Sequence, residues 1–239
     1  MEYENKIIFG GPRSGTKLLA KIFQNHGYHN FGEFFNSFSC DIVNDLIPYA
    51  KRISIEEQEK ISKARPINGY WYDDFKHSKI IRDRFKLFNN FESTTPSIVT
   101  IWEASLKLAP ELFKLTDNRF VLCTRRENRL DQLISRCITK THFNHDEEIE
   151  STPVTISLNS FEFHFQSLVY TEQLQDQFIN LGKGQLIDFN KLIAGQEDLG
   201  FEYKVETQDQ HTDLASLVLN LDDVRKKFNT LKRKYRMSW

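Results

Sequence analysis

The densest group of chemistry-bearing side chains lies near the start of the chain, in a glycine-rich run. Arg13, Ser14, Thr16 and Lys17 supply two cations and two hydroxyl groups there, and they stand among Gly10, Gly11 and Gly15. Cations and hydroxyls on a glycine-rich loop are suited to binding phosphate, because glycine lets backbone amides come close to the anion. The run therefore predicts a phosphate-binding loop.

The residues on either side of this loop predict the elements that position it. Ile7, Ile8 and Phe9 form a short apolar run typical of a buried strand, and apolar residues from Leu18 to Phe23 recur at helical spacing. A loop between a strand and a helix N-terminus binds anions, since free amides and the helix dipole point at one spot. The alternative is an ordinary strand–turn–helix corner, since glycine and proline also occur in turns.

The loop differs from the P-loop of nucleoside-triphosphate enzymes. That motif carries lysine and then a hydroxyl residue after its last glycine, whereas Thr16 and Lys17 stand here in the reverse order. Triphosphate enzymes also hold a metal with an acidic residue at a strand end. The predicted strand 119–124 leads instead into Arg125 and Arg126, and Asp188 is the one acidic candidate at a strand end. This pattern favours a phosphate held by side-chain cations without a metal.

Further strands and helices alternate along the chain. Strands are predicted at Ser97–Ile101, Arg119–Thr124 and Gln185–Asp188, and helices at Leu106–Leu115, Leu130–Thr139, Phe161–Asn180 and Leu221–Tyr235. Apolar strands that alternate with helices predict a central, mostly parallel sheet covered on both faces, a three-layer α/β/α fold. The last of these helices is basic, and we expect its cations to form a solvated face.

The segment 36–96 has a different character. It contains a predicted polar helix start at Ser54 and Glu57, an aromatic, turn-rich loop at 66–74 and a charged helical pattern at 73–90. We interpret this segment as a cap over the site, where the acceptor would bind, within a single domain spanning 1–239. The alternative is that its aromatic residues simply pack the cap.

Composition bounds the class of protein. The 239 residues are 39% hydrophobic and 27% charged with a formal net charge of −1, so broad nucleic-acid binding has no compositional support. Cys40, Cys123 and Cys137 are odd in number and lack metal-ligand spacing, which argues against a disulfide framework. No apolar run approaches the roughly 18 residues of a membrane span, and the polar first residues do not resemble a secretory signal. We expect a soluble, cytoplasmic protein.

Together the two phosphate-binding segments resemble the sulfotransferases that use 3′-phosphoadenylyl sulfate (PAPS), which have a P-loop-containing nucleoside triphosphate hydrolase-like fold. Residues 11–18 match their 5′-phosphosulfate loop, and Arg126 through Ser135 is similar to their 3′-phosphate motif. The run Gly32-Glu33-Phe34-Phe35 resembles the segment that carries the general base in bacterial carbohydrate and glycolipid sulfotransferases of the trehalose type. A weaker likeness covers Leu186–Leu192.

This resemblance implies a reaction and a set of site residues. A hydroxyl of a small-molecule or glycan acceptor would take the sulfuryl group of PAPS and release 3′-phosphoadenosine 5′-phosphate (PAP), with no metal. Glu33 would be the general base, and Arg13 would stabilise the leaving phosphate. The nucleotide-binding residues would be Gly11, Pro12, Arg13, Ser14, Gly15, Thr16, Lys17, Leu18, Arg126 and Ser135.

Several assignments have alternatives. Arg125 rather than Arg126 could contact the 3′-phosphate, although we favour Arg126, and basic residues of the C-terminal helix could approach the same group. Glu33 could be an ordinary exposed carboxylate, with His26 or His29 as the base, and Ser135 could bond its own helix. The protein could also be a phosphoryl transferase of the nucleotide-kinase type, or a PAP-binding protein without catalytic activity.

Overall fold

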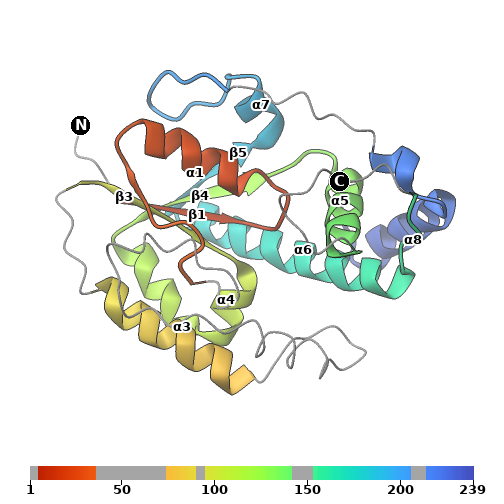
Figure 1. Ribbon diagram of the computed structural model, residues 1–239, viewed down its shortest axis with the longest axis horizontal. Helices are drawn as coiled ribbons and strands as arrows, with labels where there is room; N and C mark the ends of the chain where they lie inside the picture. Colours follow the sequence, from red (N-terminus) through yellow and green to blue (C-terminus); the bar gives the residue numbers. More distant parts are fainter. Residues whose placement is uncertain (1–4, 36–73, 90–94, 142–152, 206–213) are drawn as a thin grey trace.

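The predicted strands all form, and a fifth joins them. The computed structural model describes residues 5–35, 74–89, 95–141, 153–205 and 214–239 (Figure 1). The strands are β1 (Lys6–Gly10), β2 (His29–Asn30), β3 (Ser97–Ile101), β4 (Phe120–Arg125) and β5 (Gly184–Asp188). The short β2 was not predicted, because two residues are too few to show a pattern. The capping box at Ser54, the aromatic loop at 66–73 and Cys40 lie outside the described residues.

All five strands run parallel, in the order β2-β3-β1-β4-β5. The prediction of an α/β fold with a parallel sheet is therefore confirmed. The chain leaves β1 for strands on one side of it and later returns as β4 on the other side. Open α/β sheets bind ligands at the carboxyl ends of the strands, beside such a change of direction. The predicted phosphate loop begins at this point.

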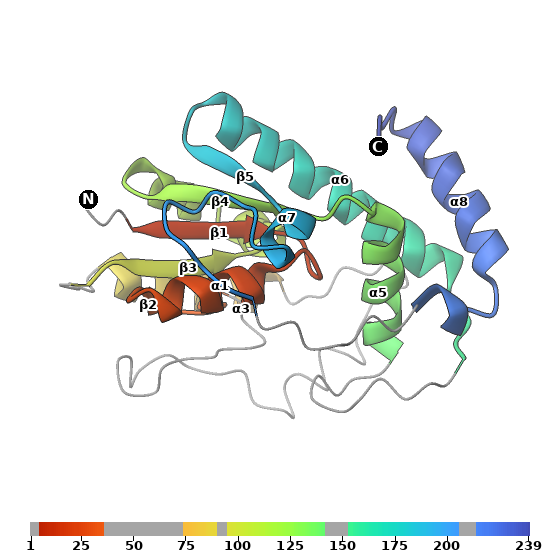
Figure 2. The same ribbon diagram turned by 90° about the horizontal axis from the view of Figure 1, so that it is seen from above.

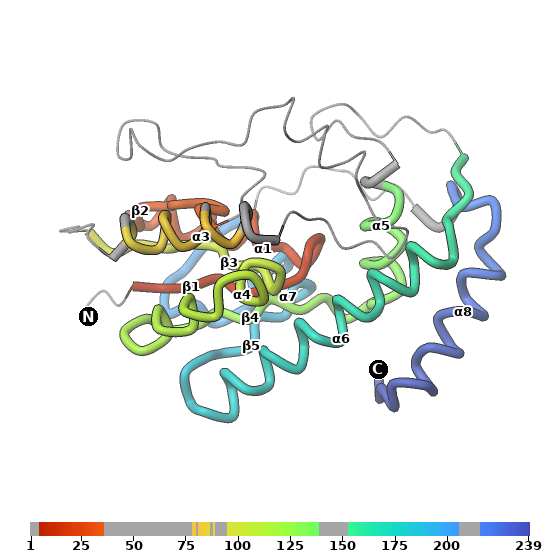
Figure 3. Tube along the Cα trace, turned by 90° about the horizontal axis from the view of Figure 1, so that it is seen from below, coloured from red at the N-terminus to blue at the C-terminus, as the bar shows by residue number. Residues whose placement is uncertain are grey.

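Helices cover both faces of the sheet (Figures 1 and 2). One face carries α1 (Thr16–Asn25) and α7 (Phe189–Ile193), and the other carries α3 (Asp74–Asn89), α4 (Glu103–Leu108) and α6 (Leu158–Asn180). Beyond the sheet, α5 (Arg129–Thr141) and α8 (Leu221–Lys234) pack against α6 (Figure 3). None of the helices in the described ranges is both long and apolar enough to cross a membrane.

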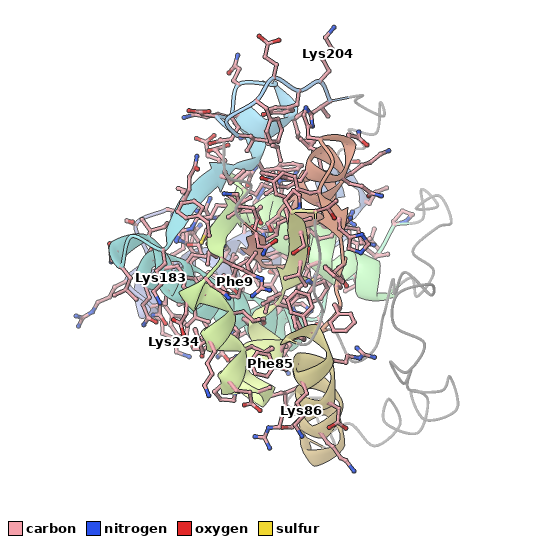
Figure 4. The ribbon with its side chains drawn as sticks, turned by 90° about the vertical axis from the view of Figure 1, so that its left-hand side faces the viewer. Phe9, Phe85, Lys86, Lys183, Lys204 and Lys234 are labelled. Atoms are coloured by element: carbon pink, nitrogen blue, oxygen red, sulfur yellow. The ribbon has the colours of Figure 1, made fainter. Side chains whose placement is uncertain are left out.

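The alternation of side chains along β1 divides the core into two layers. Ile7 and Phe9 pack with α3, α4 and α6, whereas Ile8 packs with α1, because successive side chains of a strand point to opposite faces. Figure 4 shows Phe9 inside the molecule and Lys86 and Lys204 at its periphery. Cys123 and Cys137 are buried, and burial raises the pKa of the Cys123 thiol to about 12.

Two helical segments differ from the predictions or extend them. The helix predicted at 106–115 is instead α4, which ends at Leu108, followed by a 3-10 helix, η1 (Pro110–Asp117). Pro110 lacks an N–H and disfavours helical backbone in the residue before it, and Ala109 is accordingly non-helical at φ −141°. A second 3-10 helix, η2, spans Leu214–Leu217. Within the predicted cap, α3 buries Ile81 and Phe88 in the main core.

Gln175 provides a test of how the two central strands are held together. Its side chain is fully buried, and its Nε2 donates to Phe9 O and Thr124 O at 3.0 Å each. We expect Gln175→Leu to lower the free energy of unfolding by about 3 kcal/mol, because two carbonyls lose their partner without access to water. Urea unfolding would measure the change. The exposed Gln177 on the same helix provides the control, and an equal loss in Gln177→Leu would contradict this role for Gln175.

Candidate functional site

The loop between β1 and α1 is braced against β4. The Ser14 hydroxyl donates to Gly11 O at 2.6 Å and lies 2.7 Å from Thr124 Oγ1. Ser14 is 1% exposed, and its hydroxyl stabilises the loop from within through these two contacts. A Cβ atom on Gly10 would stand 2.0 Å from Thr124 Oγ1, so only glycine allows β4 to approach this closely.

Two residues of the loop adopt left-handed backbone. Gly15 has φ 90° and Arg13 has φ 64°. Such a conformation strains a non-glycine residue by about 1–3 kcal/mol, and strain of this kind clusters at ligand clamps. Gly15 is also the N-cap of α1, and as a glycine it has no side chain with which to cap the first amides of the helix. The loop thus leaves helix N-terminal amides available to an anion. In the first turn of α1, Thr16 is buried, Lys17 exposed and Leu18 half-buried.

The two sequence motifs meet through α5. Arg13 Nε donates to Ser135 Oγ at 2.9 Å, and Gln132 Nε2 donates to Pro12 O at 3.1 Å. Ser135 is thus bonded to the loop. The alternative interpretation, in which its hydroxyl bonds its own helix, does not account for this contact. Residues more than 100 positions apart in the chain form one site at the carboxyl ends of β1 and β4.

The two arginines after β4 have different surroundings. The Arg125 side chain is held by α6: it donates to Gln175 Oε1 at 2.7 Å, to Glu172 O at 3.0 Å and to Asp176 Oδ1 at 2.5 Å. The Arg126 guanidinium instead lies over the ring of Phe189, 5.5 Å from its centre. Arg126 is therefore the arginine that remains available at the site.

Arg126 also lies close enough to Arg13 to influence the pKa of its guanidinium. Burial and, second, the positive charge of Arg126 lower the pKa of Arg13. Across the described residues, neither arginine forms an ion pair with a carboxylate. Two neighbouring cations without a counter-charge create a strongly positive spot that favours an anionic ligand.

Glu33 is buried at the same edge of the sheet, 7% exposed, so its interpretation as an exposed carboxylate is wrong. Its segment runs beside β3 and α4, because Thr100 N donates to Gly32 O at 2.8 Å and Ser105 Oγ to Phe35 O at 3.1 Å. His29 pairs with Ser97 at the amino end of the sheet, and His26 lies at the far end of α1. The ten residues of α1 span about 15 Å, so His26 lies far from the loop.

Sequence reasoning missed two residues that follow strands at this edge, Phe189 and Glu103. Phe189 follows β5, and a Cβ on Gly15 would stand 2.3 Å from its ring. Glu103 follows β3 and is 5% exposed, and its carboxylate accepts a hydrogen bond from the Ser167 hydroxyl. The available signal was their position just after a predicted strand. Asp188 ends β5, two strands from β1, and its carboxylate caps α7 by accepting from Asn190 N at 2.7 Å.

The C-terminal region is linked to the site through Trp239, and not through the basic residues of α8 that were considered for this role. Lys227 and Lys234 pair with Glu162 of α6 at 2.5 and 3.1 Å. Trp239 Nε1 donates to Glu172 Oε2 at 2.7 Å, and Arg129 Nε donates to the other oxygen of this carboxylate, also at 2.7 Å. Arg129 in turn bonds the backbone carbonyl of Arg126. The end of the chain therefore supports the backbone that carries Arg126.

The different surroundings of the two arginines predict that their replacement by alanine affects the stability of the protein differently. Arg125→Ala should lower the free energy of unfolding by about 2 kcal/mol, since it removes three hydrogen bonds to a side chain that is 17% exposed. Arg126→Ala should leave stability within about 0.5 kcal/mol of the parent or raise it, because it removes repulsion with Arg13. Urea unfolding of both variants measures this difference. Equal destabilisation by the two changes would contradict it.

The chain matches no model of a known protein family, and no curated protein shows significant sequence similarity to it. The site is thus described by its own geometry. A strained glycine-rich loop caps a helix, two arginines without a carboxylate partner among the described residues lie beside it, and a buried glutamate stands at the same edge of the sheet.

Proposed function

We propose that this protein is a sulfotransferase of P-loop-like fold that moves the sulfuryl group of PAPS to a hydroxyl of an acceptor, in the class of carbohydrates or glycolipids. The observation that carries the proposal is the convergence of Arg13 and Arg126 at the carboxyl ends of β1 and β4, without an ion-pair partner among the described residues. The ring of Phe189 joins the two places, because it lies against both Gly15 and Arg126. PAPS bears a 5′-phosphosulfate and a separate 3′-phosphate. It therefore supplies negative charge at two places to match two arginines.

The loop suits the 5′-phosphosulfate. The amides at the start of α1 have no side-chain cap, and Arg13 reaches the same region from a strained backbone conformation. When the acceptor oxygen attacks sulfur, the bond from sulfur to the bridging oxygen breaks and negative charge develops on the 5′-phosphate of the departing PAP. Preorganised donors stabilise such charge without reorganising, and Arg13 would act in this way together with the loop amides. Thr16 and Lys17 would hold the remaining oxygens.

Arg126 and Ser135 would bind the 3′-phosphate. Support comes from the engagement of Arg125 with α6, which leaves Arg126 as the available arginine at this strand end. Ser135 already bonds Arg13, so its hydroxyl lies within reach of the same ligand. A guanidinium binds phosphate oxygens through paired N–H groups, so Arg126 would distinguish PAP from nucleotides without a 3′-phosphate.

Glu33 would take the proton from the attacking hydroxyl. Its burial beside Phe34 and Phe35, at the carboxyl end of the sheet, supports a role beyond that of a solvated surface carboxylate. The proton passes from the acceptor oxygen to a Glu33 carboxylate oxygen as the new oxygen–sulfur bond forms. Magnesium-dependent phosphoryl transfer has less support, because the carboxylate of Asp188, its candidate metal ligand, already caps α7.

Nucleotide selectivity tests the 3′-phosphate assignment. PAP at about 100 times its dissociation constant should stabilise the protein by about 2.7 kcal/mol, and AMP at the same concentration should stabilise it far less. Arg126→Ala should remove the advantage of PAP over AMP, whereas Arg225→Ala on the exposed face of α8 should keep it. Thermal unfolding with each nucleotide measures both effects. Equal stabilisation of the parent by PAP and AMP would refute the assignment.

Sulfate transfer tests the role of Glu33. With labelled PAPS and a panel of sugar and glycolipid acceptors, Glu33→Gln should lower kcat by about 10²–10⁴-fold, because the general base is lost, and should leave PAP binding intact. Asp117→Asn, in an exposed ion pair with Lys183, is the matched control. A Glu33→Gln variant with full activity contradicts the base assignment. Tight PAP binding without transfer to any acceptor would indicate a non-catalytic PAP-binding protein.

A further inference from the structure

The segments that follow β4 and β5 stay side by side beyond the sheet. Arg125 and Asp188 form the last paired positions of the two strands. One residue further on, the guanidinium of Arg126 lies over the ring of Phe189. One residue beyond that, Asn190 Nδ2 donates to Glu127 Oε2 at 3.1 Å. These two contacts, Arg126 with Phe189 and Glu127 with Asn190, hold the two segments together.

Phe189 touches both parts of the candidate site. Its ring packs so closely on Gly15 that a Cβ there would stand 2.3 Å from Cδ2 and 2.7 Å from Cε2. Its contact with Arg126 links the same ring to the second arginine. A single aromatic side chain thus lies between the phosphate loop and the cation that follows β4.

The position of this ring is firmly held. Asp188, directly before Phe189, caps α7 by accepting from Asn190 N at 2.7 Å and Lys191 N at 3.2 Å. Asp188 N donates in turn to Glu197 Oε2 at 3.0 Å. The backbone on both sides of Phe189 is therefore bonded, and its ring presents a preorganised surface to Arg126.

Arg126 needs such a surface because its neighbour repels it. The charge of Arg126 lowers the pKa of Arg13, so the two guanidinium groups are close enough to interact unfavourably. The ring of Phe189 supplies this surface, with its centre 5.5 Å from the Arg126 guanidinium. A cation over an aromatic ring is attracted to it, and a guanidinium that stacks on a ring keeps its N–H edge available for an anion.

We propose that Phe189 is a positioning residue that confers selectivity for a 3′-phosphorylated nucleotide, by holding Arg126 beside Arg13 against their mutual repulsion. This inference rests on the proposed function and deepens it. Phe189 acts through Arg126, because the ring holds the guanidinium in its binding orientation before the nucleotide arrives. Its replacement therefore weakens recognition of the 3′-phosphate more than recognition of the 5′-phosphate.

Calorimetric titration with PAP and AMP tests the inference. Phe189→Leu should weaken PAP binding about tenfold and AMP binding less than twofold. Phe189→Tyr keeps the ring and should restore PAP affinity. In an Arg126→Ala background, Phe189→Leu should cause no further loss of PAP affinity, since its partner is already absent. Phe201→Leu, which alters a ring stacked on His26 at the far end of α1, is the control and should change neither affinity.

The outcomes separate this inference from the proposed function. Equal losses of PAP and AMP affinity in Phe189→Leu would show that the ring acts through the loop, which overturns the inference. Additive losses in the double variant, or failure of Phe189→Tyr to restore PAP binding, would overturn it as well. If Arg126→Ala itself leaves the preference for PAP over AMP unchanged, the proposed 3′-phosphate site fails, whatever Phe189 does. Thermal unfolding of each variant verifies that it is folded.

Discussion

The side-chain amide of Gln175 joins the carboxyl ends of the two central strands, and the geometry of the candidate site depends on this junction. Its Nε2 bonds the carbonyls of Phe9 and Thr124, and its Oε1 accepts from Arg125. The amide is fully buried, so water does not compete for these bonds. The predicted phosphate loop starts just after Phe9, and the two arginines start just after Thr124. The pairing of β1 with β4 sets the spacing between loop and arginines, and an amide on α6 that itself takes no part in the site secures it.

The loop is stabilised by a hydroxyl group that the sequence pattern predicts to bind the ligand. The Ser14 hydroxyl is used within the protein, where it meets Gly11 O and Thr124 Oγ1. This internal use frees the backbone amides of the loop, because a loop held from within keeps its shape without a ligand. The strain at Arg13 fits the same picture, since a left-handed arginine persists only where its surroundings determine its conformation.

Charge is distributed unequally around the end of β4. Arg125 is neutralised by Asp176, and Arg129 by Glu172, which also accepts from the C-terminal Trp239. Arg126, between them in the chain, forms no such pair within the described residues and lies near Arg13. Neighbouring cations destabilise an empty site and stabilise an anionic complex. Two paired arginines thus flank Arg126 in the chain, and the positive charge without an ion-pair partner among the described residues is that of Arg126 and Arg13.

Much of this arrangement could be predicted from local sequence, and the rest required the tertiary structure. The strands other than β2, the helix α1 and the glycine loop between β1 and α1 follow from apolar periodicity and from the freedom of glycine, which are properties of short segments. The proximity of the loop to the segment after β4 follows from a parallel sheet only once its strand order is known. Which arginine is available depended on Gln175 and Asp176, some 50 residues away. The inward position of Ser14, the remoteness of His26 and His29 and the contact of Phe189 with Arg126 depended likewise on packing between distant segments. Sequence by itself determined which groups were present and their local conformation, whereas the fold decided which of them face one another, because a side chain's partners are set by elements far away in the chain.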